Sequence, residues 1–380
     1  MSGYRVQNPA TGEVVETFDT ATDSQIDAAL AAADDAYREW RERSVQQRAE
    51  VVKRVAELFA ERKDELADHI TIEMGKSRAE ALDEVDFAAS IIDYYAVHGP
   101  SLITDYEIPS TVPGRAYIEH RPIGALLGVM PSNFPYYQVA RFAAPNLLLG
   151  NTILLKHAEI CPRSSLAIEA IMREAGVPEG GYQNVFASHD QIATMIADPR
   201  VQGVSLTGSE RAGAIIGAQA GRHLKKCVLE LGGIDPMIVL DAADVADVAR
   251  QAWEFRVYNG GQVCNSNKRL IVMDDIHDEF VAELKRLAEG GLERLAHLAH
   301  DDRGEIVTPI TVQLSDAAQG LGALGRGGAR PDAVSVVGGG DGLFDPGIAQ
   351  RVVLGEGLTG GGIDDGVVAH GAPFRFVVRT

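Results

Sequence analysis

One cysteine lies in a stretch whose residue types could support covalent chemistry. Cys264 follows the glycine pair 260–261 in the sequence YNGGQVCNS (258–266), and the strand-like segment RLIVM (269–273) comes next. Glycines permit backbone angles that other residues resist, and they let a ligand approach closely. A thiolate held at the end of an element in this way is a candidate nucleophile.

A carboxylate upstream is the candidate partner of this thiol. Glu230 lies between two apolar residues, and a glycine pair (232–233) follows it closely. A thiolate nucleophile and a positioned carboxylate base form a common pair in covalent catalysis. By residue type alone, a lone cysteine is more often a buried structural residue. A lone glutamate before two glycines is more often a charge at the end of a strand.

The two stretches together resemble the active-site motifs of the aldehyde dehydrogenase superfamily. The chain has Glu-Leu-Gly-Gly at 230–233 and Gly-Gln-Val-Cys at 261–264, and Glu-Met-Gly-Lys at 73–76 supports the same register. The sequence is most similar to the NAD(P)-dependent succinate-semialdehyde dehydrogenases, over about residues 4–290. The resemblance implies an enzyme that oxidises an aldehyde to the acid, with succinic semialdehyde as the first candidate substrate.

The resemblance also implies a role for three residues. Cys264 would attack the aldehyde carbon, and the thiohemiacetal would lose a hydride to nicotinamide and become a thioester. Glu230 would activate the water that hydrolyses the thioester. Asn133, in the sequence MPSNFP (130–135), would stabilise the oxyanion together with the backbone N–H of Cys264. By composition alone, this asparagine would be a turn residue.

Polar residues at the ends of predicted strands are candidates for binding the dinucleotide. Gly208 and Ser209, followed by Gly213, open a helix after a strand, and the N–H groups of a helix N-terminus suit a pyrophosphate. The resemblance places Lys156 and Glu159 at the adenosine ribose. A carboxylate there repels a 2′-phosphate, which favours NAD, with NADP as the second option. By residue type alone, the two could be a solvated ion pair.

Arg141 is the candidate for recognising the substrate. It lies eight residues after Asn133 and matches an arginine that pairs with the substrate carboxylate in succinate-semialdehyde dehydrogenases. A guanidinium suits a carboxylate because its planar fork offers two N–H donors. An arginine on the surface of a helix is the alternative interpretation.

The elements that would position these residues alternate along the chain. A hairpin of 116–120 with 123–130 is predicted to lead into a central strand. Helices are predicted over 23–40, 48–70, 78–98, 136–149, 162–174 and 192–197 and to about 221, and further strands over 152–156, 184–187 and 201–206. This alternation predicts an α/β fold with a doubly wound parallel sheet, in which ligands bind beyond the carboxyl ends of the strands.

The family architecture would divide the chain into three parts. Residues 1–230 would form the Rossmann-like NAD(P)-binding domain, with an oligomerisation hairpin at about 105–122. Residues 231–290 would begin a second, catalytic α/β domain that is truncated. Inside the matching part, Ser132 replaces the usual tryptophan before the asparagine, and Ile234 replaces a usual serine or lysine.

Residues 291–380 do not match the family and hold 19 of the 40 glycines. They lack the Glu-x-Phe-Gly-Pro motif, whose glutamate holds the nicotinamide ribose, and the final oligomerisation strand. The abrupt change in composition favours an out-of-frame translation, with a diverged, flexible segment as the alternative. The second domain then lacks partners for its core, so we expect poor stability. A homo-oligomer, usual in the family, is doubtful here.

The composition limits the partners. A net charge of −19 argues against binding of nucleic acid or an anionic membrane. There is no signal-peptide core, no membrane-span run and no zinc-ligand spacing. The resemblance implies a small-molecule aldehyde as the partner. Three distant cysteines (Cys161, Cys227, Cys264) suggest free thiols in a reducing compartment, and hence a cytoplasmic protein.

Two other functions stay open from the sequence. The chain could be a catalytically dead remnant that at most binds dinucleotide. It could also be a cysteine hydrolase, which would use Cys264 and Glu230 without the dinucleotide-binding residues.

Overall fold

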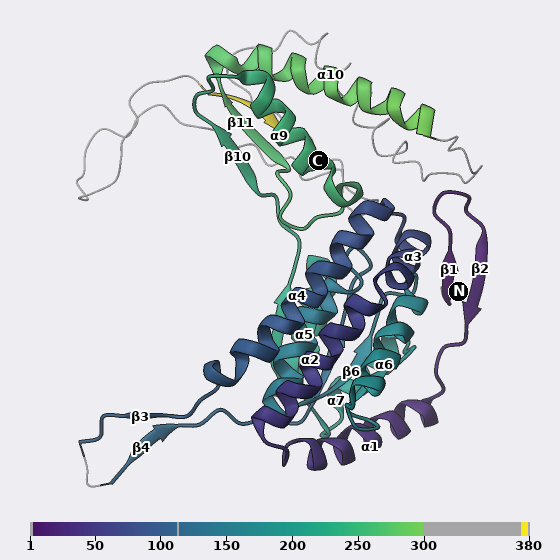
Figure 1. Ribbon diagram of the computed structural model, residues 1–380, viewed down its shortest axis with the longest axis vertical. Helices are drawn as coiled ribbons and strands as arrows, with labels where there is room; N and C mark the ends of the chain where they lie inside the picture. Colours follow the sequence, from purple (N-terminus) through teal and green to yellow (C-terminus); the bar gives the residue numbers. More distant parts are fainter. Residues whose placement is uncertain (1–2, 112–113, 299–373, 379–380) are drawn as a thin grey trace. The chain divides into compact units, whose positions relative to one another are not determined.

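The computed structural model describes residues 3–111, 114–298 and 374–378 (Figure 1). The chain divides into two compact units, Met1–Gly232 and Gly233–Thr380, and each is described by itself. Both units combine helices with a sheet, so the fold is α/β, as the sequence predicts. Within the described residues, no helix has the length and apolar character needed to cross a bilayer.

The core of the first unit is a parallel sheet with the strand order β7-β6-β5-β8-β9. Its strands are β5 (Ala125–Val129), β6 (Thr152–Lys156), β7 (Tyr182–Asn184), β8 (Val201–Thr207) and β9 (Lys226–Glu230). The chain winds outward from β5 to β7 and then returns to the other side of β5 with β8. This reversal places a topological switch point between β5 and β8, where sheets of this kind bind ligands.

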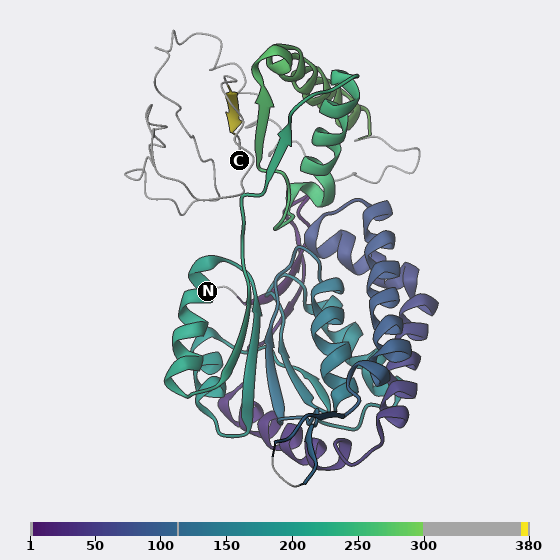
Figure 2. The same cartoon turned by 90° about the vertical axis from the view of Figure 1, so that its left-hand side faces the viewer.

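Helices cover both faces of this sheet (Figure 2). They are α1 (Asp23–Trp40), α2 (Val45–Glu61), α3 (Lys63–Met74), α4 (Arg78–Leu102), α5 (Tyr137–Leu149), α6 (Pro162–Ala175), α7 (His189–Ala197) and α8 (Glu210–Arg222). Leu126 and Ile153 pack with α2 to α6, whereas Leu127 and Leu154 pack with α1, α7 and α8. Successive strand residues therefore enter opposite cores, as expected for a doubly wound sheet.

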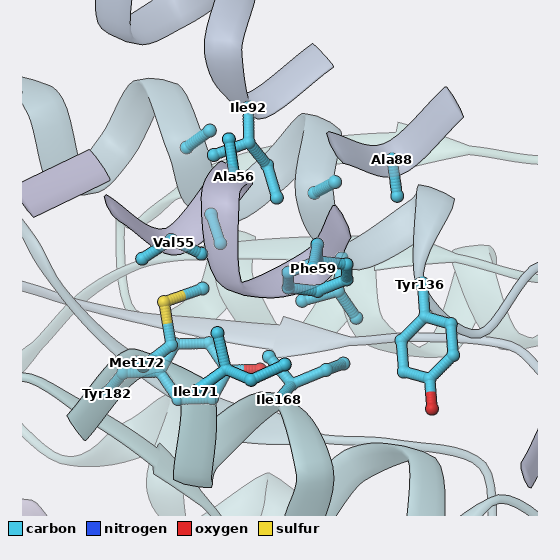
Figure 3. Packing of buried hydrophobic residues seen from close by; sticks show 14 of the residues in the cluster. Val55, Ala56, Phe59, Ala88, Ile92, Tyr136, Ile168, Ile171, Met172 and Tyr182 are labelled. Atoms are coloured by element: carbon cyan, nitrogen blue, oxygen red, sulfur yellow. The ribbon is translucent and has the colours of Figure 1, made fainter. Parts of the chain in front are cut away.

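Local sequence explains where several of these helices begin. Helices α1, α2, α4 and α7 each start with a capping box, in which a serine or threonine and a residue three positions later satisfy each other's backbone N–H groups. The larger core then joins α2, α4 and α6. Figure 3 shows Phe59, Ile92 and Ile168 within this core, with Tyr136 beside Phe59. The rings of Tyr136 and Phe59 meet edge to face at 5.7 Å.

The helix predicted over 48–70 is wrong in one respect, because it is two helices. Helix α2 ends at Glu61 and α3 begins at Lys63, and Arg62 between them has φ −104° and ψ 20°, outside the helical range. Buried apolar residues continue through the break on both helices. A periodic apolar pattern therefore did not reveal it.

The predicted pairing of 116–120 with 123–130 is also wrong. Strand β4 (Ala116–Ile118) pairs antiparallel with β3 (Tyr106–Ile108), whereas β5 pairs in parallel with β6 and β8. Alternating residues indicate a strand, but they do not specify its partner. The strand predicted over 184–187 lies earlier, at β7, because its pairing with β6 begins at Tyr182. Strands β1 (Tyr4–Gln7) and β2 (Val14–Phe18) form a separate antiparallel pair.

The second unit has a three-stranded sheet of order β10-β11-β12. Its elements are β10 (Pro236–Val239), α9 (Val245–Val257), the 3₁₀ turn η1 (Tyr258–Gly261), β11 (Arg269–Met273), α10 (Asp274–Leu298) and β12 (Phe374–Val378). Strand β12 pairs antiparallel with β11, so the glycine-rich tail supplies one strand of this sheet. The prediction for residues 299–373 lies outside the described residues.

Candidate active site

The carboxyl ends of four strands meet at one edge of the sheet in the first unit. Val129 at the end of β5 is in register with Lys156 on one side and with Leu206 on the other. One position further, Thr207 of β8 is in register with Glu230 of β9. Parallel pairing therefore brings residues as far apart as Val129 and Glu230 to one edge, where the sequence predicted the ligand site.

Asn133 lies in the loop that joins β5 to α5 at this edge. Two buried side chains hold the loop from the β6 side: His157 Nε2 donates to the carbonyl of Pro135 at 2.9 Å, and Cys161 Sγ lies 4.0 Å from the carbonyl of Ser132. The backbone N–H of Ala158 donates to His157 Nδ1 at 2.8 Å, so both ring nitrogens have the partners that a neutral imidazole needs. Burial, with the charge of Lys156 beside it, lowers the pKa of His157 to about 4.

The predicted dinucleotide residues occupy the same edge. Lys156 is buried at the end of β6, and its Nζ lies 2.5 Å from Glu159 Oε1. Ser209 caps α8, because its Oγ accepts from the N–H of Ala212 at 3.2 Å. Together they offer a cation, a carboxylate and a helix N-terminus, groups that suit the phosphates and the ribose hydroxyls of a dinucleotide.

Gly208 in this turn and Gly213 in α8 contact the chain around the candidate base. The N–H of Gly208 donates to the carbonyl of Glu230 at 2.9 Å. Gly213 is buried in α8, and a Cβ there would lie 2.5 Å from Leu231 Cδ2. In this structure Gly213 therefore makes room for Leu231, next to Glu230.

Arg141 lies on α5 and reaches the same edge. Its guanidinium is 3.2 Å from the Glu230 carboxylate and 3.4 Å from Thr207 Oγ1, and it lies over the ring of Tyr137. A pocket of about 420 Å³ opens beside it. The pocket is lined by Phe87, Ser90, Ile91, Tyr94, Tyr95, Tyr137 and Arg141. An aromatic wall with one cation suits a short chain that ends in a carboxylate.

Sequence reasoning missed the aromatic wall. Phe87 and Tyr94 lie seven residues apart on α4 and are 53 % and 51 % exposed, so they do not pack in the core. Two large aromatic residues at helical spacing outside the apolar stripe of α4 were the available signal.

Cys264 belongs to the second unit, in the loop between η1 and β11. Asn259, Gly260 and Gly261 have φ values of 57°, 63° and 76°, the left-handed region that glycine and asparagine tolerate best. Lys268 Nζ then donates to the carbonyls of Gly233 at 2.8 Å and Cys264 at 3.2 Å. The turn and the lysine together present Cys264 on the surface.

The three cysteines have different environments, and none is in a disulfide. Cys161 is buried beside the Asn133 loop, and burial raises the pKa of its thiol well above the usual value. Cys227 is half-buried on β9, and burial raises its pKa too. Cys264 is exposed, so it is the accessible nucleophile of the three.

Comparison with known proteins gives a consistent result. The Aldehyde dehydrogenase family matches residues 2–309, which includes the expected range 4–290 and continues beyond it. The succinate-semialdehyde dehydrogenase [NADP(+)] of Deinococcus radiodurans is 49 % identical over 338 residues, or 87 % of this chain and 70 % of that protein. The succinate semialdehyde dehydrogenase [NAD(P)+] Sad of Escherichia coli is 43 % identical over 72 % of this chain and 59 % of that protein.

Solved structures share the fold. The succinic semialdehyde dehydrogenase from Streptococcus pyogenes, in complex with NADP+, has a TM-score of 0.73 and 42 % identity. The likeness covers 76 % of this chain and 63 % of that one, so the chain spans less than two thirds of the solved enzyme. The family match, the curated relatives and this structural likeness together show that the chain belongs to the aldehyde dehydrogenase family of NAD(P)-dependent oxidoreductases.

Proposed function

We propose that the chain oxidises succinic semialdehyde to succinate with NAD(P)+ and uses Cys264 as the nucleophile. The observation that supports this substrate is the place of Arg141, a cation that lines an aromatic pocket and lies 3.2 Å from Glu230. A substrate with an aldehyde at one end and a carboxylate at the other would satisfy both features. The named relatives act on this same aldehyde.

Each residue has a defined task in this proposal. The Cys264 thiolate attacks the aldehyde carbon, and the side-chain N–H of Asn133 and the N–H of Cys264 donate to the oxygen that becomes negative. A bound nicotinamide would supply the acceptor for the hydride that the thiohemiacetal loses as it becomes a thioester. Glu230 then takes a proton from the water that attacks the thioester, and the acid leaves while the Cys264 thiolate is regenerated.

The dinucleotide would be held by this chain at the β6 and β8 ends. The turn at Gly208 and Ser209 would face the pyrophosphate, and Lys156 and Glu159 would face the adenosine ribose. The relatives are named for NADP(+) or NAD(P)+. In this chain Lys156 would attract the 2′-phosphate of NADP+, whereas Glu159 would repel it. We therefore propose that the chain uses both NAD+ and NADP+.

The β3–β4 hairpin is the proposed oligomerisation element. Tyr106 and Tyr117 are 53 % and 55 % exposed on it, and Ile118 is 40 % exposed. Apolar strands that are exposed in one chain favour burial against a second copy.

The activity is tested with the purified chain of residues 1–380. We expect NADPH or NADH formation with succinic semialdehyde and none with Cys264→Ala. An acid product without any requirement for dinucleotide would favour the cysteine hydrolase instead. A folded chain that binds NADP+ and forms no product would identify a remnant.

A further inference from the structure

We propose that the buried ion pair of Lys76 and Glu84 positions Asn133 for its work at the oxyanion. The inference rests on the proposed function, because that function supplies the role of Asn133. Lys76 Nζ contacts Glu84 Oε2, and both side chains have 0 % exposure. The pair joins the turn after α3 to the second turn of α4. It lies outside the residues that would touch substrate or dinucleotide.

Glu84 holds the chain just after Asn133. Its second oxygen, Oε1, accepts from the backbone N–H of Tyr136 at 2.8 Å and of Tyr137 at 3.1 Å. The first N–H groups of a helix have no partner inside the helix, and in the described structure the N-cap residue of α5, Tyr136, makes no side-chain cap. Glu84, 52 residues earlier in the chain, therefore caps α5.

Lys76 holds the residue next to Asn133. Its Nζ lies 4.2 Å from the centre of the Phe134 ring, within the range of a cation–π contact. With the bond from His157 to the carbonyl of Pro135, the loop is held at residues 134, 135, 136 and 137. Asn133 is thus fixed by the segment that follows it.

The energetics of the pair also favour a positioning role. Burial lowers the pKa of Lys76 and raises that of Glu84, because both charges leave water. Well-packed apolar side chains often replace such pairs without loss of stability. Apolar residues at positions 76 and 84 could not supply the two hydrogen bonds to the backbone of α5 or the cation–π contact with Phe134.

Glu73, in the same motif as Lys76, is a buried carboxylate that caps a second helix in the same way. It is buried and accepts from the N–H of Arg163 at 2.6 Å and from Ser164 Oγ at 2.6 Å, in the first turn of α6. Gly75 ends α3 between the two charged residues, with φ 82°. The motif at 73–76 therefore connects α3 to both helices that flank β6.

Two double variants separate the acceptor from the charge. Lys76→Met with Glu84→Gln removes both charges and keeps an oxygen for the two N–H groups, whereas Lys76→Met with Glu84→Leu removes the oxygen as well. We expect the leucine variant to lower kcat by roughly 100-fold relative to the glutamine variant, with the Kd for NADP+ unchanged. In an Asn133→Ala background, the difference between the two should disappear.

Amide hydrogen exchange provides a readout that does not depend on turnover. We expect peptides covering 132–137 to exchange about tenfold faster in the leucine variant than in the glutamine variant. Asp86→Asn, which removes the exposed pair with Lys63 between α3 and α4, is the matched control and should change neither readout.

The outcomes keep the two proposals apart. Equal exchange and equal kcat in the two double variants would overturn the positioning role. If the wild type forms no product from any aldehyde, the proposed function fails, and the exchange result alone decides whether the pair holds the segment.

If the leucine variant does not fold, Glu84→Asp keeps the charge and withdraws the acceptor by one methylene. It should change the exchange and kcat in the same direction, and unchanged values would again overturn the role.

Discussion

The guanidinium of Arg141 lies 3.2 Å from the carboxylate of Glu230, although α5 and the end of β9 are almost 90 residues apart in the chain. The candidate cation for the substrate carboxylate therefore contacts the candidate base. A substrate carboxylate that binds Arg141 would compete with Glu230 for the same donors. Substrate recognition and the position of the base are linked in this way.

Arg141→Met tests the substrate proposal. We expect kcat/KM for succinic semialdehyde to fall by about 100-fold, because hydrogen bonds between charged groups are each worth about 1.5–3 kcal/mol. Butanal, which lacks the carboxylate, should change by less than about threefold. Arg38→Met on α1, which removes an exposed arginine, is the control. Equal losses with both aldehydes would show that Arg141 does not recognise the carboxylate.

Glu159→Gln tests the choice of dinucleotide. The carboxylate lies 2.5 Å from Lys156, so its removal takes away a negative charge and releases the lysine. We expect the ratio of kcat/KM for NADP+ to that for NAD+ to rise by about tenfold, as one charge interaction near the surface allows. An unchanged ratio would mean that Glu159 does not face the ribose.

The low pKa of His157 predicts that the folded protein loses stability in acid. Its folded pKa of about 4 is below the ordinary value of 6.5, so the unfolded chain binds the proton more tightly. His157 therefore contributes about 3 kcal/mol to the free energy of unfolding above pH 6.5. This contribution is lost as the pH falls from 6.5 through 4.

Chemical denaturation at several pH values measures this effect. The difference in unfolding free energy between wild type and His157→Gln should narrow from pH 7 to pH 4. A difference that stays constant over this range would show that the imidazole does not titrate on unfolding.

Thiol labelling tests the accessibility of the nucleophile. Iodoacetamide should label Cys264 first, because it is exposed, and Cys161 only after unfolding. Peptide mapping after partial labelling identifies the sites, and Cys264→Ala should remove the fastest phase. Faster labelling of the half-buried Cys227 would contradict the assignment.

Local sequence was sufficient for much of the fold. Apolar periodicity placed α1 at its observed bounds, and β6 and β11 lie where continuous apolar runs predicted strands. These patterns report how single elements bury one face or both. They did not show the break at Arg62, because the apolar side chains continue across it, nor that β4 pairs with β3.

The sequence by itself determined which residues can do chemistry, since a thiol, carboxylates and a guanidinium have that capacity in any fold. Only the tertiary structure decided which of them meet. The parallel register brings Lys156, Thr207 and Glu230 to one edge, and helix α5 places Arg141 beside Glu230. Glu84 contacts residues 136 and 137 from 52 positions away. Such contacts depend on strand order and helix packing, which no short window of sequence contains.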